Sequence, residues 1–583
     1  MATTMAPGAW TDVQADETSD ALVAAMGLGG VEYLFFTSGS EIMFYQEAIA
    51  KAKAQGKPAP KLITMTHEHP SLNAAIGYGM VTGRAAATAA HVDVGTQNYG
   101  GAVHTAFRGS VPVLITAGGP PTSYPDSMRG SRDGAHFWLQ QGFDQNGIVR
   151  QYVKWDHKLS SQDNPGLIVS RALQVAQSEP QGPVYLSLPR EVAMSAVDNA
   201  RFPTVDQLGL ARPAGPDLDA IRQAAEWLVQ ARNPAVVVAR SGRNPETVPA
   251  LVELCELLGL PVVEAAWRSY QCFPYDHPLY QGPMSLRDCD MVLVLEGDIP
   301  WLPGPNAPPP DAKIVVVDID PIKPAIPTYE FTANLRITSD ALLGIRALHE
   351  AAQGATSSGD RQRFADRAGR WGDASRERRE KAAQEAQGVA TKSPIDPLWL
   401  CYQLGEVIDD NCVVMDETLA AAPVWRYVKG SQPRSYFKNP GSSGGWGPGA
   451  ALGAKLAMPN KDIIMTSGDG FYMYAVANPA IWAARQYGAP FMAVVFQNRS
   501  YSTGTRATVG YYPEGYSARS GLEGGYFDPP IDFAKEAEAA GAYGENVRDP
   551  AEVGPALRRG LEQIRNGTPA VISVWLPKLV SGD

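Results

Sequence analysis

The chain is expected to be an α/β protein of three doubly wound domains in series, each built on a mainly parallel sheet. Three stretches of the chain share one sequence pattern. In each, short β-branched or aromatic runs (VEYLFFT, PAVVVAR, DIIMTSGDG) alternate with amphipathic segments (ALVAAMG, TVPALVELCELLG, NPAIWAARQYG). This alternation is typical of β-α units around a parallel sheet. At 583 residues the chain is also several times the usual domain length, which favours three domains.

The domain boundaries follow from changes in composition. The first domain, residues 1–192, closes at GPVYLSLPREV, and a proline-bearing stretch without periodicity follows it. The second domain, residues 217–352, has predicted strands at PAVVVAR, MVLVLEG and AKIVVVDIDP, and the charged segment after it predicts a solvated helix and linker. The third domain is residues 394–583. Its Gly- and Tyr-rich stretch 501–527 is expected to be a mobile loop near a site.

Composition excludes several classes of protein. Apolar residues make up 44% of the chain and charged residues 19%, as in a globular protein, and no apolar run reaches the ~20 residues of a membrane span. The formal net charge is −11 without a long basic cluster, which argues against nucleic acid and favours a small-molecule partner. No secretion signal is evident, so a cytoplasmic location is expected. Five widely spaced cysteines predict reduced, structural thiols.

The most specific motif lies in a predicted β-α-β unit of the third domain. A strand runs into the segment 467–470 (SGDG), and after a helical pattern a second strand ends at Gln497 and Asn498. Ligands bind at the carboxyl ends of parallel strands, and glycines there let main-chain N–H groups approach a diphosphate. Asp469 and Asn498 offer the hard oxygens that Mg²⁺ prefers, and the main-chain carbonyl of Ser500 is a third candidate ligand.

This unit resembles the thiamine-diphosphate signature of the pyruvate decarboxylase, acetolactate synthase and benzoylformate decarboxylase family, in which GDG precedes an asparagine pair by nearly thirty residues. The spacing from Asp469 to Asn498 matches, with Gln497 in place of the first asparagine. The resemblance implies thiamine diphosphate and Mg²⁺ as cofactors. The residues expected beside the cofactor are Ser467, Gly468, Asp469, Gly470, Phe471, Asn498, Ser442, Gly444, Glu417 and Gln97.

Glu68 is the first candidate catalytic residue. A predicted strand ends at His67-Glu68-His69 and is followed by a helix of small residues. The segment is similar to the family's HE-x(n)-A-x-GYA-x-x-TG pattern, which implies that Glu68 activates the cofactor through its aminopyrimidine ring. Family members place this glutamate and the diphosphate domain on different chains. The resemblance therefore implies a homodimer with shared active sites, assembled further into a homotetramer.

His91 and Ser40 are the other candidate catalytic residues. His91 in AAHVDVGTQN resembles a histidine of benzoylformate decarboxylase that transfers protons, and Ser40 in TSGSE matches a serine of the same enzyme. A histidine titrates near neutral pH, which suits proton transfer to and from a carbanion. The alternative is a structural histidine and a capping serine. Four further histidines are expected to be structural: His67, His69, His104 and His136.

The sequence departs from the family at Gly444. Family members carry a bulky aliphatic residue there, which holds the cofactor in its V shape, so either Trp446 or a neighbour replaces it or the pocket is wider. The resemblance places at Ser442 the main-chain carbonyl that accepts a hydrogen bond from the aminopyrimidine amine.

The central domain ends in VVVDIDPIKPAIP, which resembles the region that holds FAD in acetolactate synthase or an ADP moiety in the acyl-CoA branch. No FAD fingerprint is evident. Asp318 and Asp320 either meet a ribose or form an ordinary surface turn, so binding of FAD, ADP or CoA is left open.

The sequence thus predicts a lyase or transferase that cleaves or forms a carbon–carbon bond of a 2-oxo acid, as a decarboxylase or carboligase. One alternative is an acyl-CoA enzyme similar to 2-hydroxyacyl-CoA lyase or oxalyl-CoA decarboxylase. The other is a cofactor-binding regulator without activity.

Overall fold

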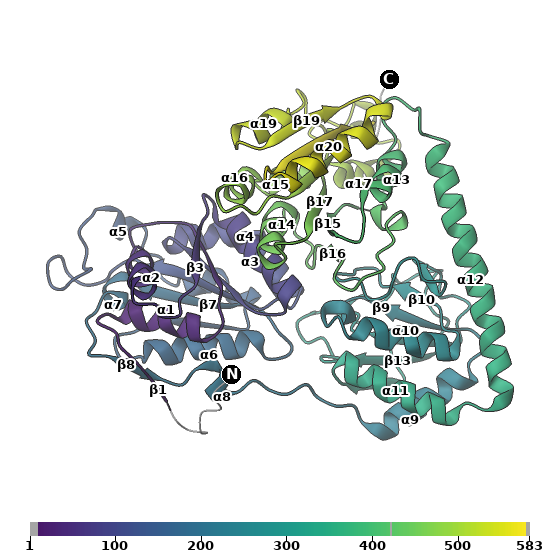
Figure 1. Ribbon diagram of the computed structural model, residues 1–583, viewed down its shortest axis with the longest axis horizontal. Helices are drawn as coiled ribbons and strands as arrows, with labels where there is room; N and C mark the ends of the chain where they lie inside the picture. The colour runs from purple at the N-terminus through teal and green to yellow at the C-terminus, as the bar shows by residue number, and fades with distance from the viewer. Residues whose placement is uncertain (1–9, 420–421, 579–583) are drawn as a thin grey trace.

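Three six-stranded parallel sheets, each covered by helices, form the computed structural model of the chain, which describes residues 10–419 and 422–578 (Figure 1). The termini of the expected first and third domains, residues 1–9 and 579–583, lie outside these ranges. A small antiparallel sheet pairs β1 (Thr11–Val13) with β8 (Ala200–Phe202). Short 3-10 helices occupy Asn146–Ile148, Arg150–Tyr152, Ser241–Arg243, Val424–Arg426 and Pro550–Glu552. The predicted α/β class with three parallel sheets in series is confirmed.

The N-terminal sheet brings three strand ends together at one edge. Its strands, in spatial order, are β3 (Lys61–Thr64), β2 (Tyr33–Phe36), β4 (Ala86–Ala90), β5 (Val113–Gly119), β7 (Val184–Pro189) and β6 (Trp155–Lys158). Its helices are α1 (Thr18–Leu28), α2 (Phe44–Ala54), α3 (Glu68–Thr82), α4 (Val92–Arg108), α5 (His136–Leu139), α6 (Pro165–Gln177), α7 (Arg190–Ala193) and α8 (Val205–Leu208). Because both faces are covered, β4 is buried along its whole length and its sequence, AATAA, is almost continuously apolar.

The central sheet leads into a long helix that connects it to the third domain. Its strands, in spatial order, are β11 (Tyr280–Gly282), β10 (Val262–Glu264), β9 (Pro234–Val238), β12 (Met291–Leu295), β13 (Lys313–Asp318) and β14 (Leu335–Thr338). Its helices are α9 (Leu218–Gln230), α10 (Thr247–Leu258) and α11 (Ala341–Ala355). The charged segment forms α12 (Ser358–Gln387), which runs along one side of the molecule (Figure 1). Among the described residues, no helix is both long and apolar enough to cross a membrane.

The C-terminal sheet carries the strand ends of the GDG motif. Its strands, in spatial order, are β16 (Tyr436–Lys438), β15 (Cys412–Glu417), β17 (Asp462–Gly468), β18 (Met492–Gln497), β20 (Ala570–Trp575) and β19 (Tyr543–Val547). Its helices are α13 (Pro397–Val407), α14 (Gly447–Ala457), α15 (Asp469–Tyr474), α16 (Asn478–Gln486), α17 (Ser502–Tyr511), α18 (Tyr516–Arg519), α19 (Phe533–Ala539) and α20 (Val553–Arg565). The stretch 501–527, expected to be a loop, therefore contains two helices.

Helix α3 packs on α14 and ties the N-terminal domain to the C-terminal domain. Both helices are rich in Gly and Ala, so their backbones approach closely. A Cβ on Gly77 would lie 2.2 Å from the carbonyl oxygen of Ala450, and one on Gly453 would lie 2.0 Å from that of Ala74. This contact places the start of α3, with Glu68, beside the segment that leads into α14.

We expect Gly453→Ala to destabilise the protein, because the added methyl group meets backbone that has no rotamer with which to avoid it. Overpacking of this kind costs about 1–3 kcal/mol. Gly369→Ala, in the exposed helix α12, is the matched control, since a Cβ there meets nothing within 4 Å. Alanine favours a helix over glycine by about 1 kcal/mol, so the control should be neutral or more stable. Urea unfolding measures the free energy of unfolding of both variants. Equal free energies of unfolding for Gly453→Ala and Gly369→Ala would contradict the close packing of α3 on α14.

Candidate active site

Asp469 lies where β17 and β18 end side by side. It is the first residue of α15 and is buried. Its Oδ1 accepts the N–H of Gly470 at 2.8 Å, and its Oδ2 accepts the N–H of Arg499 at 2.5 Å. Burial raises the pKa of Asp469 to about 6, although these main-chain donors lower it in part. A buried carboxylate held mainly by main-chain N–H groups fits a metal ligand, because a divalent cation would compensate its charge.

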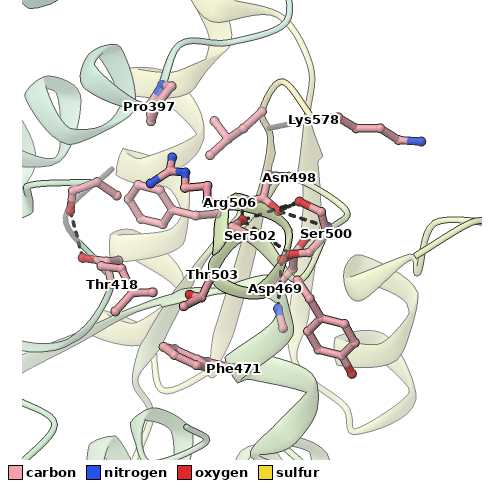
Figure 2. A pocket seen from close by; sticks show the side chains of 18 of the residues that line it. Pro397, Thr418, Asp469, Phe471, Asn498, Ser500, Ser502, Thr503, Arg506 and Lys578 are labelled. Carbon is pink, nitrogen blue, oxygen red and sulfur yellow. Dashed lines mark hydrogen bonds between the residues drawn. The ribbon is translucent and has the colours of Figure 1, made fainter. Parts of the chain in front are cut away.

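Asn498 and Ser500 follow β18 and lie beside Asp469 (Figure 2). The Oδ1 of Asn498 accepts both the N–H and the hydroxyl of Ser500, at 3.0 and 2.9 Å, and its Nδ2 donates to Ser502 Oγ at 2.7 Å. The carbonyl of Ser500 accepts the N–H of Ser502 at 2.8 Å and, more weakly, the Ser502 hydroxyl at 3.5 Å. The structure thus gathers the three candidate metal ligands. Coordination by Asn498 Oδ1 would require the Ser500 hydroxyl to turn away.

A cavity of about 660 Å³ opens next to these oxygens, within the size range of small-molecule sites. Its apolar wall includes Leu419, Ala422, Phe471, Tyr474, Phe496 and Leu576. Gly468 and Gly470 present bare backbone to it, and a Cβ on Gly468 would meet nothing within 4 Å. A ligand with an anionic end at the strand termini and an apolar body fits this lining. Ser467, the residue before this turn, is fully buried in β17.

Phe471 supplies the bulk beside Gly444. A Cβ on Gly444 would lie 2.4 Å from a carbon of the Phe471 ring, and that ring lines the cavity (Figure 2). Trp446, considered above as the replacement, is 1% exposed and packs into the hydrophobic core. A side chain from the next β-α unit, and not Trp446, therefore occupies the space.

Glu417 ends β15 and also lines the cavity. Its carboxylate accepts the N–H groups of Trp446 and Gly447, at 2.8 and 2.9 Å, and the Nδ2 of Asn439 at 2.8 Å. Burial raises the pKa of Glu417 to about 7, although these donors lower it in part. Glu417 thus anchors the start of α14. Ser442, earlier in the same segment, is exposed, and its Oγ lies 3.0 Å from His104 Nε2.

Glu68 is buried at the start of α3. Its Oε2 accepts a hydrogen bond from Asn98 Nδ2 at 3.0 Å, and a Cβ on Gly95 would lie 2.9 Å from Oε1. The next residue, His69, contacts the Gly445 carbonyl through Nε2 at 3.2 Å, and burial lowers its pKa to about 4. Gln97 is exposed, and Asn98 rather than Gln97 contacts Glu68.

Ser40 and His91 follow β2 and β4, and β2 lies between β4 and β3, the strand that leads to Glu68. Both contact Glu41. His91 Nδ1 lies 2.7 Å from Glu41 Oε2, and Ser40 Oγ donates to the same oxygen at 2.9 Å. His136, expected to be structural, lies 3.3 Å from Ser40 Oγ. The structure therefore brings the two candidate proton-handling residues onto one carboxylate.

Sequence patterns do not identify Glu41, Asn98 or Arg506, which lines the cavity from α17. Glu41 directly follows Ser40, and Asn98 directly follows Gln97, so the segments were recognised but the contacting side chains were not. A carboxylate one position after a candidate serine was the available signal for Glu41. Arg506 lies in no motif.

The carboxyl edge of the central sheet is filled with ion pairs. Asp318 is fully buried and pairs with Lys323 at 2.6 Å, and Lys323 also pairs with Asp298 at 2.9 Å. Arg240 reaches Asp298 at 3.1 Å. Asp320 accepts the N–H of Lys323 at 3.3 Å. Since Asp318 is already paired and has no exposed surface, this edge does not favour a nucleotide ribose at Asp318.

Comparison with known proteins gives matches over all three domains. Family models described as "Thiamine pyrophosphate enzyme" match residues 16–148 (N-terminal TPP binding domain), 221–348 (central domain) and 420–574 (C-terminal TPP binding domain). Benzoylformate decarboxylase of Pseudomonas aeruginosa is 27% identical over 75% of this chain and 78% of its own length. The probable acetolactate synthase large subunit of Methanocaldococcus jannaschii is 23% identical over 93% of this chain and 89% of its own length.

A solved structure, the benzoylformate decarboxylase from Polynucleobacter necessarius, has a TM-score of 0.76 to this chain. It is 20% identical in sequence, and the match covers 97% of this chain and 100% of that one. At this identity the likeness shows a shared fold.

We expect the Glu417 carboxyl group to make the protein less stable as the pH rises from about 5 to 8. Its pKa is about 7 when folded and near the ordinary 4.5 when unfolded, so between these values the folded chain keeps a proton that the unfolded chain has lost. Glu417→Gln removes this dependence. The measurement is urea unfolding of the protein without cofactors. As the pH rises from about 5 to 8, the urea midpoint of Glu417→Gln should increase relative to the midpoint of the parent at the same pH.

Glu377→Gln, on an exposed position of α12, is the control and should follow the pH dependence of the parent. Parallel curves for the parent and Glu417→Gln would show that the buried carboxyl titrates normally.

Proposed function

This chain belongs to the thiamine pyrophosphate enzyme family, and from that premise we propose a thiamine-diphosphate- and Mg²⁺-dependent enzyme that cleaves or forms a carbon–carbon bond of a 2-oxo acid. The proposal rests above all on the adjacent ends of β17 and β18, where Asp469, Asn498 and Ser500 offer oxygens next to a cavity with an apolar wall. The relatives named as benzoylformate decarboxylase and acetolactate synthase support this class of reaction.

The C-terminal domain would hold the cofactor. Asp469 and Asn498 would bind Mg²⁺ together with the Ser500 carbonyl, and the backbone at Gly468 and Gly470 would face the diphosphate. When bound, thiamine diphosphate supplies the electron sink for the bond next to the substrate carbonyl. The Phe471 ring would support the cofactor beside Gly444, and Arg506 brings a positive charge to the same cavity, where it suits a substrate carboxylate.

The N-terminal domain would move the protons. Glu68 is buried, and the hydrogen bond from Asn98 fixes its Oε2. Its Oε1 lies beside Gly95 without such a donor among the described residues, so this oxygen would be the one that accepts a proton. His91 and Ser40 would hold and transfer the proton at the reacting carbon. Their position at the ends of neighbouring strands supports a common role.

The division of the site supports a homodimer, and a homotetramer would be a pair of such dimers. Every residue that lines the cavity at Asp469 belongs to the C-terminal domain, and no N-terminal-domain residue that the structure describes reaches it. The start of α3 lies against the segment before α14 through His69, which contacts the Gly445 carbonyl, but Glu68 does not line this cavity. A second chain would therefore supply the proton-handling residues.

The central domain does not support the acyl-CoA alternative, because Asp318 is paired with Lys323 and is not free to bind a nucleotide ribose. The regulator alternative has to explain why Glu68, Asp469 and Asn498 are all kept in place. Screening 2-oxo acids against 2-hydroxyacyl-CoA esters, with thiamine diphosphate and Mg²⁺ present, distinguishes the two enzymatic readings by product.

We expect Glu68→Gln to lower kcat for the best 2-oxo acid by about 10²–10⁴-fold, the range that general acid–base catalysis contributes. Thiamine diphosphate affinity, measured by calorimetry, should change little, because the substitution keeps the shape of the side chain. Glu377→Gln should leave both quantities unchanged. A Glu68→Gln enzyme with the kcat of the parent would rule out this role for Glu68.

A further inference from the structure

Glu41 is a fully buried carboxylate on which a serine and two histidines converge. His91 Nδ1 lies 2.7 Å and Ser40 Oγ 2.9 Å from Oε2, while His136 Nε2 lies 3.9 Å from Oε1. His136 also approaches Ser40 Oγ at 3.3 Å. These groups come from the turn after β2, the start of α4 and the short helix α5. The cluster is thus assembled by the fold and not by one local motif.

Two glycines hold the cluster rigidly. A Cβ on Gly39 would lie 2.4 Å from the His91 ring, and a Cβ on Gly118 would lie 2.7 Å from the Cβ of Glu41. The carboxylate and the imidazole therefore have little room to change rotamer. The side chain of His91 is 26% exposed, while that of Glu41 is not exposed at all. The imidazole can reach a ligand, but the carboxylate cannot.

The charges around Glu41 favour its ionised form. The titratable groups that face it are His91 from α4 and His136 from α5, and β5 contributes only Gly118. Burial by itself would raise the pKa of Glu41. The close approach of His91 and the hydrogen bond from Ser40 outweigh this effect, so the pKa of Glu41 lies below its usual value.

We propose that Glu41 is the positioning residue of the proton-handling group: it keeps a hydrogen on Nδ1 of His91 and directs Nε2 toward the substrate. The hydrogen bond made by one ring nitrogen sets what the other nitrogen can do. A doubly protonated His91 gives its Nε2 proton to the reacting carbon and becomes neutral, with Nδ1–H still on Glu41, which stays ionised throughout. Ser40 donates to the same carboxylate oxygen that His91 faces, and His136 lies 3.9 Å from the other oxygen. This role rests on the proposed function, because it requires His91 to be the proton carrier.

Steady-state kinetics of the Glu41→Gln holoenzyme tests this role. We expect kcat to fall about 10- to 100-fold, a part of what general acid–base catalysis contributes, with KM nearly unchanged. The limb of the pH–kcat profile on which activity is lost as pH rises should move to lower pH, because the imidazolium loses its carboxylate partner and gives up its proton more readily. Glu41→Asp keeps the charge, so that limb should stay at the pH of the parent.

Glu47→Gln is the matched control, since Glu47 is exposed on the helix that follows Glu41. Its kcat and pH profile should equal those of the parent. In addition, Glu41→Gln should slow a His91→Asn enzyme no further, because Glu41 acts through His91. A merely structural Glu41 would instead give additive losses without a shift of the pH limb. If Glu41→Gln does not fold, Glu41→Asp carries the test through its kcat, which we expect to fall.

Three results would overturn the proposal for Glu41: an unchanged kcat and pH profile in Glu41→Gln, additive losses with His91→Asn, or an unchanged kcat in Glu41→Asp when Glu41→Gln does not fold. None of them affects the proposed function as long as the kcat of Glu68→Gln falls as expected. A Glu68→Gln enzyme with the kcat of the parent would instead count against the proposed function itself, so the two failures are distinguishable.

Discussion

The hydrogen bond from the Arg499 N–H to the Asp469 carboxylate ties together the ends of β17 and β18, and the proposed chemistry depends on it. Arg499 adopts a left-handed backbone (φ 57°), which costs a non-glycine residue on the order of 1–3 kcal/mol. That turn directs its N–H at Asp469, so the hydrogen bond offsets part of the strain. The same turn places Asn498 and Ser500 beside Asp469 and opens the cavity next to bare glycine backbone.

The second half of the chemistry lies on a different sheet. Glu68, Ser40 and His91 follow three adjacent strands of the N-terminal domain, and parallel strands necessarily bring such residues to one edge. Close packing of α3 on α14 fixes this edge against the segment before α14. Because the cavity at Asp469 is lined by the C-terminal domain alone, the two halves would meet in one site only across an interface between chains.

Sequence patterns predict the three parallel sheets because central strands such as β9, β12 and β18 are local, strongly apolar runs between helical segments. They also bring forward Asp469 and Asn498, since both directly follow strands that are neighbours in one β-α-β unit. The patterns do not predict that Phe471 fills the space at Gly444, because that contact depends on the packing of segments far apart in the chain. They also miss Glu41, whose importance comes from two histidines on other elements, and the helices α17 and α18, whose tyrosine-rich surfaces are largely exposed and give weak periodicity.

The central claim, that adjacent strand ends in the C-terminal domain bind thiamine diphosphate through Mg²⁺, is tested most directly by calorimetric titration of the cofactor into the metal-free protein. The account predicts binding with Mg²⁺ present, at least 10-fold weaker binding when Mg²⁺ is left out, and a comparable loss in Asp469→Asn. Equal affinity in all three titrations, or no binding to the parent with Mg²⁺ present, would contradict it.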